Sequence, residues 1–307
     1  MSLISGPICL KSTVVKSTVV KSTVVKSAVI KCAILHNAIS KSAIGKSAIS
    51  KRKTAAAFIA AAALMPPGVL AQSSALTQLS ITEKQTDLVY TAWKQGKPSV
   101  VISHTLASFT LDDAYAIQRG FVARRLQNDS IRGYKGGLTS AQLQKQFGLN
   151  EPVVAVLFAS GELASTPAKP AVVEMRQFHR LVLETEVGFV FDKPVTQPLA
   201  SVDELRKLVR GVMPAVELPD IGFSDTAHLR GVDAVANNVS ARQFIVGPQQ
   251  SKDFLTGNNL SNVSVELRCN GRALSVGKAA EVMGSPWQAV GRGRGAAAPG
   301  APRPRLA

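Results

Sequence analysis

The chain has few aromatic residues and few cysteines. Phe, Trp and Tyr make up 5% of its 307 residues. They are not interleaved with the basic residues, so the sequence offers no stacking surface of the kind that holds single-stranded nucleic acid. The three cysteines are Cys9, Cys32 and Cys269, and only the last lies outside the N-terminal tract. They build neither a disulfide framework nor a thiolate metal site.

Acidic residues are absent from both ends of the chain. The formal net charge is +16, but residues 1–71 hold ten Lys/Arg and no acid, and residues 291–307 hold four and no acid. The segment 72–290 therefore carries a formal charge of only +2. Because this segment is nearly neutral, the high overall charge says little about its partners, and we expect no nucleic-acid partner.

No apolar run is long enough for a stable membrane span. The longest, Ala55–Leu64, follows the basic Lys51-Arg52-Lys53 and precedes Val69-Leu70-Ala71. This order is typical of a secretory signal peptide cleaved after Ala71, since small or short residues stand at the positions that precede such a site. We expect an exported, periplasmic protein. The alternative is a cytoplasmic one, because fifty residues precede the segment.

The two ends of the chain have biased compositions. Residues 11–50 form a five-residue repeat that begins with KSTVV three times. Five matches neither the helical nor the strand period, so we interpret residues 1–50 as a translated DNA repeat outside the fold, with a β-prone adhesive segment as the alternative. Residues 291–307 consist almost entirely of Gly, Ala, Pro and Arg, which predicts a disordered tail. The expected divisions are 1–50, 51–71, 72–290 and 291–307.

The segment 72–290 mixes predicted helices and strands without regular alternation. Thr110 and Asp113 form a capping-box pattern before a helical apolar period, and Ser201 and Glu204 form another. An Asn270-Gly271 pair predicts a hairpin turn. The pattern indicates an α+β fold. Helices are expected over 110–126, 140–147 and 201–212, and strands over 131–135 (before a Gly136-Gly137 turn), 153–158, 182–191, 214–218, 242–246 and 262–269.

Two glutamates interrupt an otherwise apolar predicted strand. Glu184 and Glu186 are two residues apart, so their side chains share one face of the strand. Two carboxylates among apolar residues repel each other unless a cation lies between them, and all-oxygen ligation favours Mg²⁺, Mn²⁺ or Ca²⁺. Glu217, in a second short apolar strand, is a candidate third ligand. The alternative is an ordinary strand with a solvated polar face.

A lysine ends the predicted strand before two glycines. Lys135 lies in the sequence RGYKGGLTS, and the permissive backbone allows its side chain to reach into a cleft. Beside a metal and partly buried, its pKa is expected to fall toward the range useful for proton transfer. The alternative is a solvated loop lysine.

Six segments in fixed order resemble the hydratase and decarboxylase branch of the fumarylacetoacetate hydrolase superfamily, nearest the 2-keto-4-pentenoate hydratases. The resemblance covers about residues 75–290, and its specificity comes from the shared order and spacing of the segments. They are LDDAYAIQRGFVARR (111–125), GYKGGLTSAQLQKQFGLNEP (133–152), VLFASGEL (156–163), LETEVGFVF (183–191), PAVELPD (214–220) and VANNVSARQFIVG (235–247).

The resemblance implies a mixed β-roll core of the fumarylacetoacetase type and a metal-dependent hydro-lyase. It implies Mg²⁺ or Mn²⁺ held by Glu184, Glu186 and Glu217, which would chelate a small 2-oxo acid and promote its enolisation. It also implies a homo-oligomer. Lys135 and Ser240 would be the catalytic residues, and the substrate-binding residues would be Tyr134, Leu138 and Asn238.

The sequence also departs from that branch. Val153 stands where the hydratases carry an Asp, Ile221-Gly222 replaces Ser-Arg, and Asn237 replaces an Asp. These departures indicate an altered 2-oxo acid substrate. The alternatives are a decarboxylase of the 4-oxalocrotonate type, a catalytically weakened binder of 2-oxo or dicarboxylic acids, and a frameshifted product without activity. The last reflects the change of composition after Val290, from which we expect the closing strands of the roll to be missing.

Overall fold

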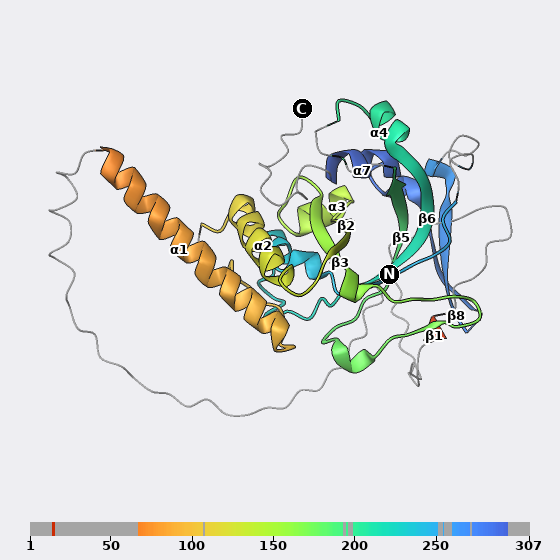
Figure 1. Cartoon of the computed structure of the whole chain (residues 1–307), viewed down its shortest axis with the longest axis horizontal. Helices are drawn as coiled ribbons and strands as arrows, with labels where there is room; N and C mark the ends of the chain where they lie inside the picture. Colours follow the sequence, from red (N-terminus) through yellow and green to blue (C-terminus); the bar gives the residue numbers. More distant parts are fainter. Residues whose placement is uncertain are drawn as a thin grey trace.

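The computed structural model describes residues 14–15, 67–106, 108–192, 195, 199–250, 254, 260–270 and 272–293. Helices and short antiparallel sheets alternate irregularly, which confirms the predicted α+β class (Figure 1). The helices are α1 (Pro67–Lys94), α2 (Leu111–Arg125), α3 (Ala141–Gln146), α4 (Val202–Leu208), α5 (Gly231–Ala236) and α7 (Pro286–Gly293). The strands are β1 (Val14–Val15), β2 (Ile131–Gly137), β3 (Val153–Phe158), β4 (Ala171–Val172), β5 (Glu184–Phe191), β6 (Val209–Leu218), β7 (Gln243–Val246), β8 (Ser264–Cys269) and β9 (Arg272–Lys278).

Short 3₁₀ turns connect several of these elements. They are η2 (Ala159–Gly161), η3 (Met175–Gln177), η4 (Asn238–Ser240), η5 (Leu260–Asn262) and η6 (Ala279–Glu281). Among them η4 follows α5 directly and contains Ser240, one of the predicted catalytic residues.

Helix α2 begins where its capping box predicts. Asp113 N donates to Thr110 Oγ1 at 3.2 Å, and Thr110 N donates back to Asp113 Oδ2 at 3.0 Å. The reciprocal bonds satisfy amide groups that have no partner inside the helix. The buried face of α2, which includes Ile117 and Phe121, packs with Val89 of α1 in the largest apolar core. In Figure 1 the long α1 runs beside α2.

Strands β2 and β3, which are connected through α3, form a two-stranded antiparallel sheet, called the β2–β3 hairpin below, in which Lys135 lies opposite Ala155. The predicted turn at Gly136-Gly137 is wrong, because both glycines lie within β2 and pair with residues of β3. The left-handed turn conformation falls instead on Leu138, with φ of 52°. Gly137 has no room for a side chain, since an added Cβ would lie 2.6 Å from Val239 Cγ1. The hairpin therefore packs tightly against η4.

The central sheet has the order β5-β6-β7 and is antiparallel throughout. Ser201 caps α4 as predicted, but the helix ends at Leu208 and not near Val212. Residues from Val209 onward pair with β5, with Val212 opposite Phe189 and Val209 opposite Phe191. Four residues that the local pattern assigned to the helix, 209–212, therefore belong to β6, because they pair with a distant strand.

The C-terminal part contains the predicted hairpin. Strands β8 and β9 pair across Asn270, whose φ of 51° is the left-handed conformation that such a turn needs. Helix α7 then places Trp287 in a second core with Leu205 and Val263, and the Trp287 and Phe189 rings are 5.0 Å apart. Residues 294–307 of the predicted tail lie outside the described residues, and the expected loss of closing strands stays a prediction.

The N-terminal predictions are only partly covered. Of the repeat, the described part is β1, which pairs antiparallel with β4, and residues 51–66 lie outside the described residues. Helix α1 begins at Pro67 and continues across the expected cleavage position after Ala71. No helix in the described ranges is long and apolar enough to cross a membrane. Export stays a prediction.

Two asparagine side chains, of which Asn238 is buried, hold η4 and α5 in place. Asn238 is 1% exposed, accepts from Val156 N and donates to Val156 O, both at 2.9 Å. Asn237 makes a similar pair of bonds to Val100 N and O, at 3.2 and 2.8 Å. Each amide thus supplies the backbone of a neighbouring segment with a donor and an acceptor, which keeps buried polar groups satisfied.

Replacing Asn238 by Ala is expected to lower the free energy of unfolding by about 3 kcal/mol, because Val156 N–H and C=O are left buried without partners. Chemical denaturation of the full chain measures the change. The control is Asn128→Ala at an exposed position, expected to stay within about 0.5 kcal/mol of wild type. Equal stability of the two variants would contradict the role assigned to Asn238.

Candidate active site

The three predicted glutamates lie on one face of the central sheet. Glu184 and Glu186 are alternate residues of β5, and Glu217 of β6 is the direct cross-strand partner of Glu184. Cross-strand partners in an antiparallel pair share a face, so the pairing brings the third carboxylate to the first two. The opposite face of β5 carries Val187 and Phe189, which pack on the core that contains Trp287.

Lys135 reaches this face from the separate β2–β3 hairpin. Its Nζ forms an ion pair with Glu217 Oε2 and lies 3.5 Å from Glu184 Oε2. The Lys135 and Glu217 side chains are 4% and 8% exposed, whereas Glu184 is 28% exposed. The site is thus buried at its Lys135–Glu217 end and opens to solvent toward Glu184. The solvated-loop alternative for Lys135 is therefore wrong.

Among the protein groups alone, the pKa of Lys135 shifts in the direction opposite to the fall that was predicted for a lysine beside a metal. Burial acts to lower the pKa of Lys135, but the charges of Glu217 and Glu184 outweigh it, and the pKa is raised. The buried ammonium thus remains charged near neutral pH. It can hold a proton and attract an anionic group, but it is not a ready general base.

The glutamates are perturbed in the opposite sense. Burial, reinforced by the charges of Glu217 and Glu184, raises the pKa of Glu186 to about 8. Burial also raises the pKa of Glu217, an effect that Lys135 opposes and Glu184 increases. Three carboxylates facing one ammonium leave an excess of negative charge in a poorly solvated place.

This donor set fits a hard divalent cation. Carboxylate oxygens are the ligands that Mg²⁺ and Mn²⁺ prefer, and a cation would offset the repulsion that adds to burial in raising the pKa of Glu186. Glu184, Glu186 and Glu217 are the residues that would hold it. Their partial opening at Glu184 leaves room for further oxygen ligands from water or substrate.

Ser240 lies at the end of η4, where the backbone is unusual. Asn238, Val239 and Ser240 have φ values of 52°, 48° and 56°, three successive left-handed residues of which none is glycine. Such conformations cost about 1–3 kcal/mol each and persist where surrounding contacts impose them. The bonds of Asn238 to β3 and of Ser240 O to Asp220 N, at 3.1 Å, supply those contacts.

The three predicted substrate-binding residues are placed differently from one another. Tyr134 is 47% exposed and, as the neighbour of Lys135 in a strand, points to the opposite face of β2. Leu138 packs against the main core, and its carbonyl accepts from Gln144 Nε2 at 2.9 Å. Asn238 is fully buried on Val156. This placement favours structural roles for Leu138 and Asn238, and it separates Tyr134 from the glutamate face.

Asp220 is a residue near the site to which the sequence analysis assigned no role. It is buried and accepts hydrogen bonds from the backbone amides of His179, Arg180 and Gly222, at 2.8–3.2 Å. Its own amide donates to Ser240 O. Asp220 therefore joins three loops at the end of β6, three residues after Glu217. The sequence signal that could have identified Asp220 is its place in PAVELPD, one of the segments that carry the family resemblance.

Val153 occupies the position where the resemblance leads us to expect an Asp. It is completely buried in β3. Its cross-strand partner is Gly137, which lies two residues after Lys135 in β2. An apolar side chain there can neither donate nor accept a proton. Any proton transfer in this part of the site must use other groups, of which Lys135 is the nearest in the hairpin.

The fold and the acidic sheet face define the class of protein, an α+β enzyme domain of the fumarylacetoacetate hydrolase superfamily. The chain is 30% identical over 209 residues to 2-keto-4-pentenoate hydratase of Paraburkholderia xenovorans (strain LB400), covering 68% of this chain and 75% of that protein. It belongs to the 2-keto-4-pentenoate hydratase family. A 2-hydroxypent-2,4-dienoate hydratase of Pseudomonas putida is 26% identical over 210 residues, covering 66% of this chain and 90% of that protein.

A solved structure shows the same fold. The 4-oxalocrotonate decarboxylase from Pseudomonas putida G7, complexed with magnesium and adipate, superposes with a TM-score of 0.62 at 22% identity. The match covers 69% of this chain and 78% of that one. No family model matches the chain.

The metal-free protein is expected to lose stability as pH rises from about 5 to 9. The folded state holds a proton on Glu186 up to about pH 8 that the unfolded state releases near its ordinary value, so raising the pH through this window favours unfolding. Thermal unfolding in EDTA measures the effect.

Replacing Glu186 by Gln should flatten that pH profile, because the side chain no longer titrates. Glu174→Gln, at an exposed glutamate, is the matched control and should keep the wild-type slope. A profile for wild type that rises across the same window would contradict the assigned perturbation.

Proposed function

We propose that the chain is a metal-dependent hydratase-like lyase that acts on 2-oxo acids, with 2-hydroxy-dienoates as the substrate class. The observation that carries the proposal is the convergence of Glu184, Glu186 and Glu217 with the buried Lys135 on one sheet face. The names of the curated relatives, which are hydratases of 2-keto-4-pentenoate and 2-hydroxypent-2,4-dienoate, support the same reaction. The magnesium in the structural neighbour supports the cofactor.

The acidic residues and the lysine have separate tasks in this proposal. The three glutamates hold Mg²⁺ or Mn²⁺, which when bound supplies Lewis-acid polarisation of the 2-oxo group. Lys135 lies beside two of them, so its ammonium would attract the substrate carboxylate and could donate a proton to the substrate. Ser240, held by Asp220 in its left-handed turn, is proposed to hydrogen-bond the substrate.

The proposed hydration balances without a further reactant. Protonation of a 2-hydroxypenta-2,4-dienoate at C5, with loss of the enol proton, gives a 2-oxo acid whose C3–C4 double bond is conjugated to the oxo group. Water then adds its hydroxyl group to C4 and its other proton to C3, leaving a 4-hydroxy-2-oxo acid. The charged Lys135 suits the first of these steps, because it can supply a proton and recover one from water.

A decarboxylase of the 4-oxalocrotonate type is the second candidate. The structural neighbour with a TM-score of 0.62 is such an enzyme, and the same enolisation would promote loss of CO₂ from a suitably placed carboxylate. Product analysis separates the two reactions, since only decarboxylation releases CO₂. The weakened-binder and inactive-product alternatives find no support in the comparisons. A homo-oligomer and export to the periplasm stay predictions.

Glu184→Gln is expected to reduce Mg²⁺-dependent turnover of 2-hydroxypenta-2,4-dienoate at least 100-fold and to weaken Mg²⁺ binding, because a metal ligand loses its charge. The loss of dienol absorbance follows the reaction, and calorimetry follows binding. Glu174→Gln serves as the exposed control. Wild-type turnover in EDTA equal to that in Mg²⁺ would contradict the proposed metal dependence.

Lys135→Met is expected to separate the two tasks. Turnover should fall at least 100-fold, whereas Mg²⁺ should bind as tightly as to wild type or more tightly, because a competing positive charge is removed from Glu217 and Glu184. The same two measurements apply. Parallel loss of metal binding and turnover in this variant would contradict a distinct catalytic role for Lys135.

A further inference from the structure

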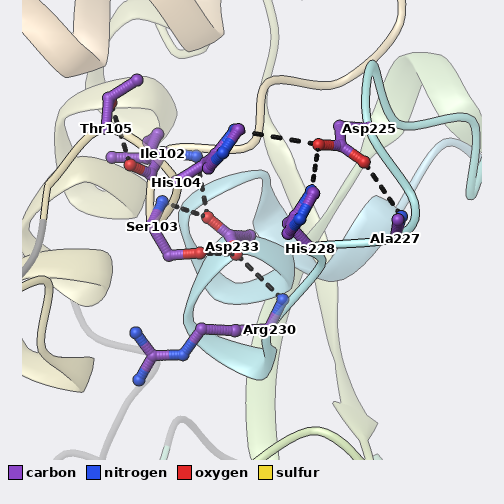
Figure 2. Close-up of polar contacts among 9 residues, drawn as sticks. All are labelled: Ile102, Ser103, His104, Thr105, Asp225, Ala227, His228, Arg230 and Asp233. Atoms are coloured by element: carbon purple, nitrogen blue, oxygen red, sulfur yellow. Dashed lines mark hydrogen bonds and ion pairs between the residues drawn. The ribbon is translucent and has the colours of Figure 1, made fainter.

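A second group of metal-ligating side chains lies apart from the glutamate face. His104 comes from the loop before α2, and Asp225 and His228 come from the loop before α5 (Figure 2). Each offers one ligand atom, and these atoms lie within 4.8 Å of one another. None of the three belongs to the site described above, and none was singled out by the sequence analysis.

The two imidazoles converge on one carboxylate oxygen. His228 Nδ1 lies 2.6 Å from Asp225 Oδ2, and His104 Nδ1 lies 3.8 Å from the same oxygen. The rings are stacked, with centroids 4.5 Å apart and an angle of 6° between their planes. Figure 2 shows both rings directed at Asp225.

Buried hydrogen bonds fix both loops that carry the cluster. Asp233 of α5 is 0% exposed and accepts from Ile102 N and Ser103 N, each at 2.8 Å. It also accepts from Ser103 Oγ at 2.6 Å and from Arg230 N at 2.9 Å. The Asp233 carboxylate thus holds the backbone just before His104 in one loop and just after His228 in the other, as Figure 2 shows. Such support lowers the entropy lost when ligands are brought together.

The Asp225 carboxylate is itself oriented. Its Oδ1 accepts from Ala227 N at 2.9 Å, which leaves Oδ2 facing the two rings. The three side chains are 59%, 32% and 58% exposed in the order His104, Asp225 and His228, so an ion has access and water can complete its coordination.

We propose that His104, Asp225 and His228 bind a transition-metal ion of the Zn²⁺ class and so link the loop before α2 to the loop before α5. Two imidazole nitrogens and one carboxylate oxygen suit Zn²⁺, Ni²⁺ or Cu²⁺, whereas Mg²⁺ prefers oxygen ligands alone. The chain therefore holds two sites with different metal preferences. This second site is independent of the proposed hydratase reaction.

The test is titration of the full chain with Zn²⁺ in excess Mg²⁺, which saturates the glutamate site. The three thiols are first blocked with N-ethylmaleimide, since cysteine also binds zinc. Wild type should bind one Zn²⁺ that His104→Ala and His228→Ala each weaken by roughly tenfold or more. Zn²⁺ should also raise the melting temperature of wild type and not that of these variants.

Two matched variants make the result specific. Asp203→Asn replaces an exposed aspartate elsewhere and should leave zinc affinity unchanged, whereas Asp225→Asn should weaken it. Glu184→Gln should keep the zinc site, so loss of the proposed hydratase activity and loss of this site are separately observable. Equal zinc affinity in wild type and His104→Ala would overturn the three-residue site, as would zinc binding that Glu184→Gln abolishes.

Discussion

The placement of a buried lysine against three glutamates is the constraint on which the rest of this structure depends. Lys135 and Glu217 are almost fully buried, and charged groups in such a place are costly unless they are paired. Burial, together with the charges of Glu217 and Glu184 that Lys135 only partly offsets, raises the pKa of Glu186 to about 8. A divalent cation would offset this imbalance, which is the physical basis of the proposed metal site.

The surrounding fold places the β2–β3 sheet and the β5-β6-β7 sheet next to each other where Lys135 meets the glutamates. Lys135 comes from the β2–β3 hairpin, whereas the glutamates come from β5 and β6. The turn η4 lies against the hairpin at Gly137 and is bonded to the end of β6 through Asp220. Its three left-handed residues are the strained part of this junction, and Asn238 stabilises them by binding Val156.

Local signals in the sequence predicted most elements, and they failed where distant segments compete. The capping box at Thr110 and the turn at Asn270 were correct because each depends on neighbours within a few residues. The predicted helix from Ser201 extended four residues too far, because pairing with β5 takes the chain from Val209 onward. The bonds of Asn238 to Val156 were not foreseen for the same reason, since that partner is 82 residues away.

The sequence by itself determined that Glu184 and Glu186 share a face, because strand geometry alternates side chains whatever surrounds the strand. It also established the family, through the order of its segments. Only the tertiary structure decided that Glu217 lies opposite Glu184, that the pKa of Lys135 is raised and not lowered, and that His104 meets Asp225 and His228. Register, burial and the sum of nearby charges arise from residues far apart in the chain, and no local pattern encodes them.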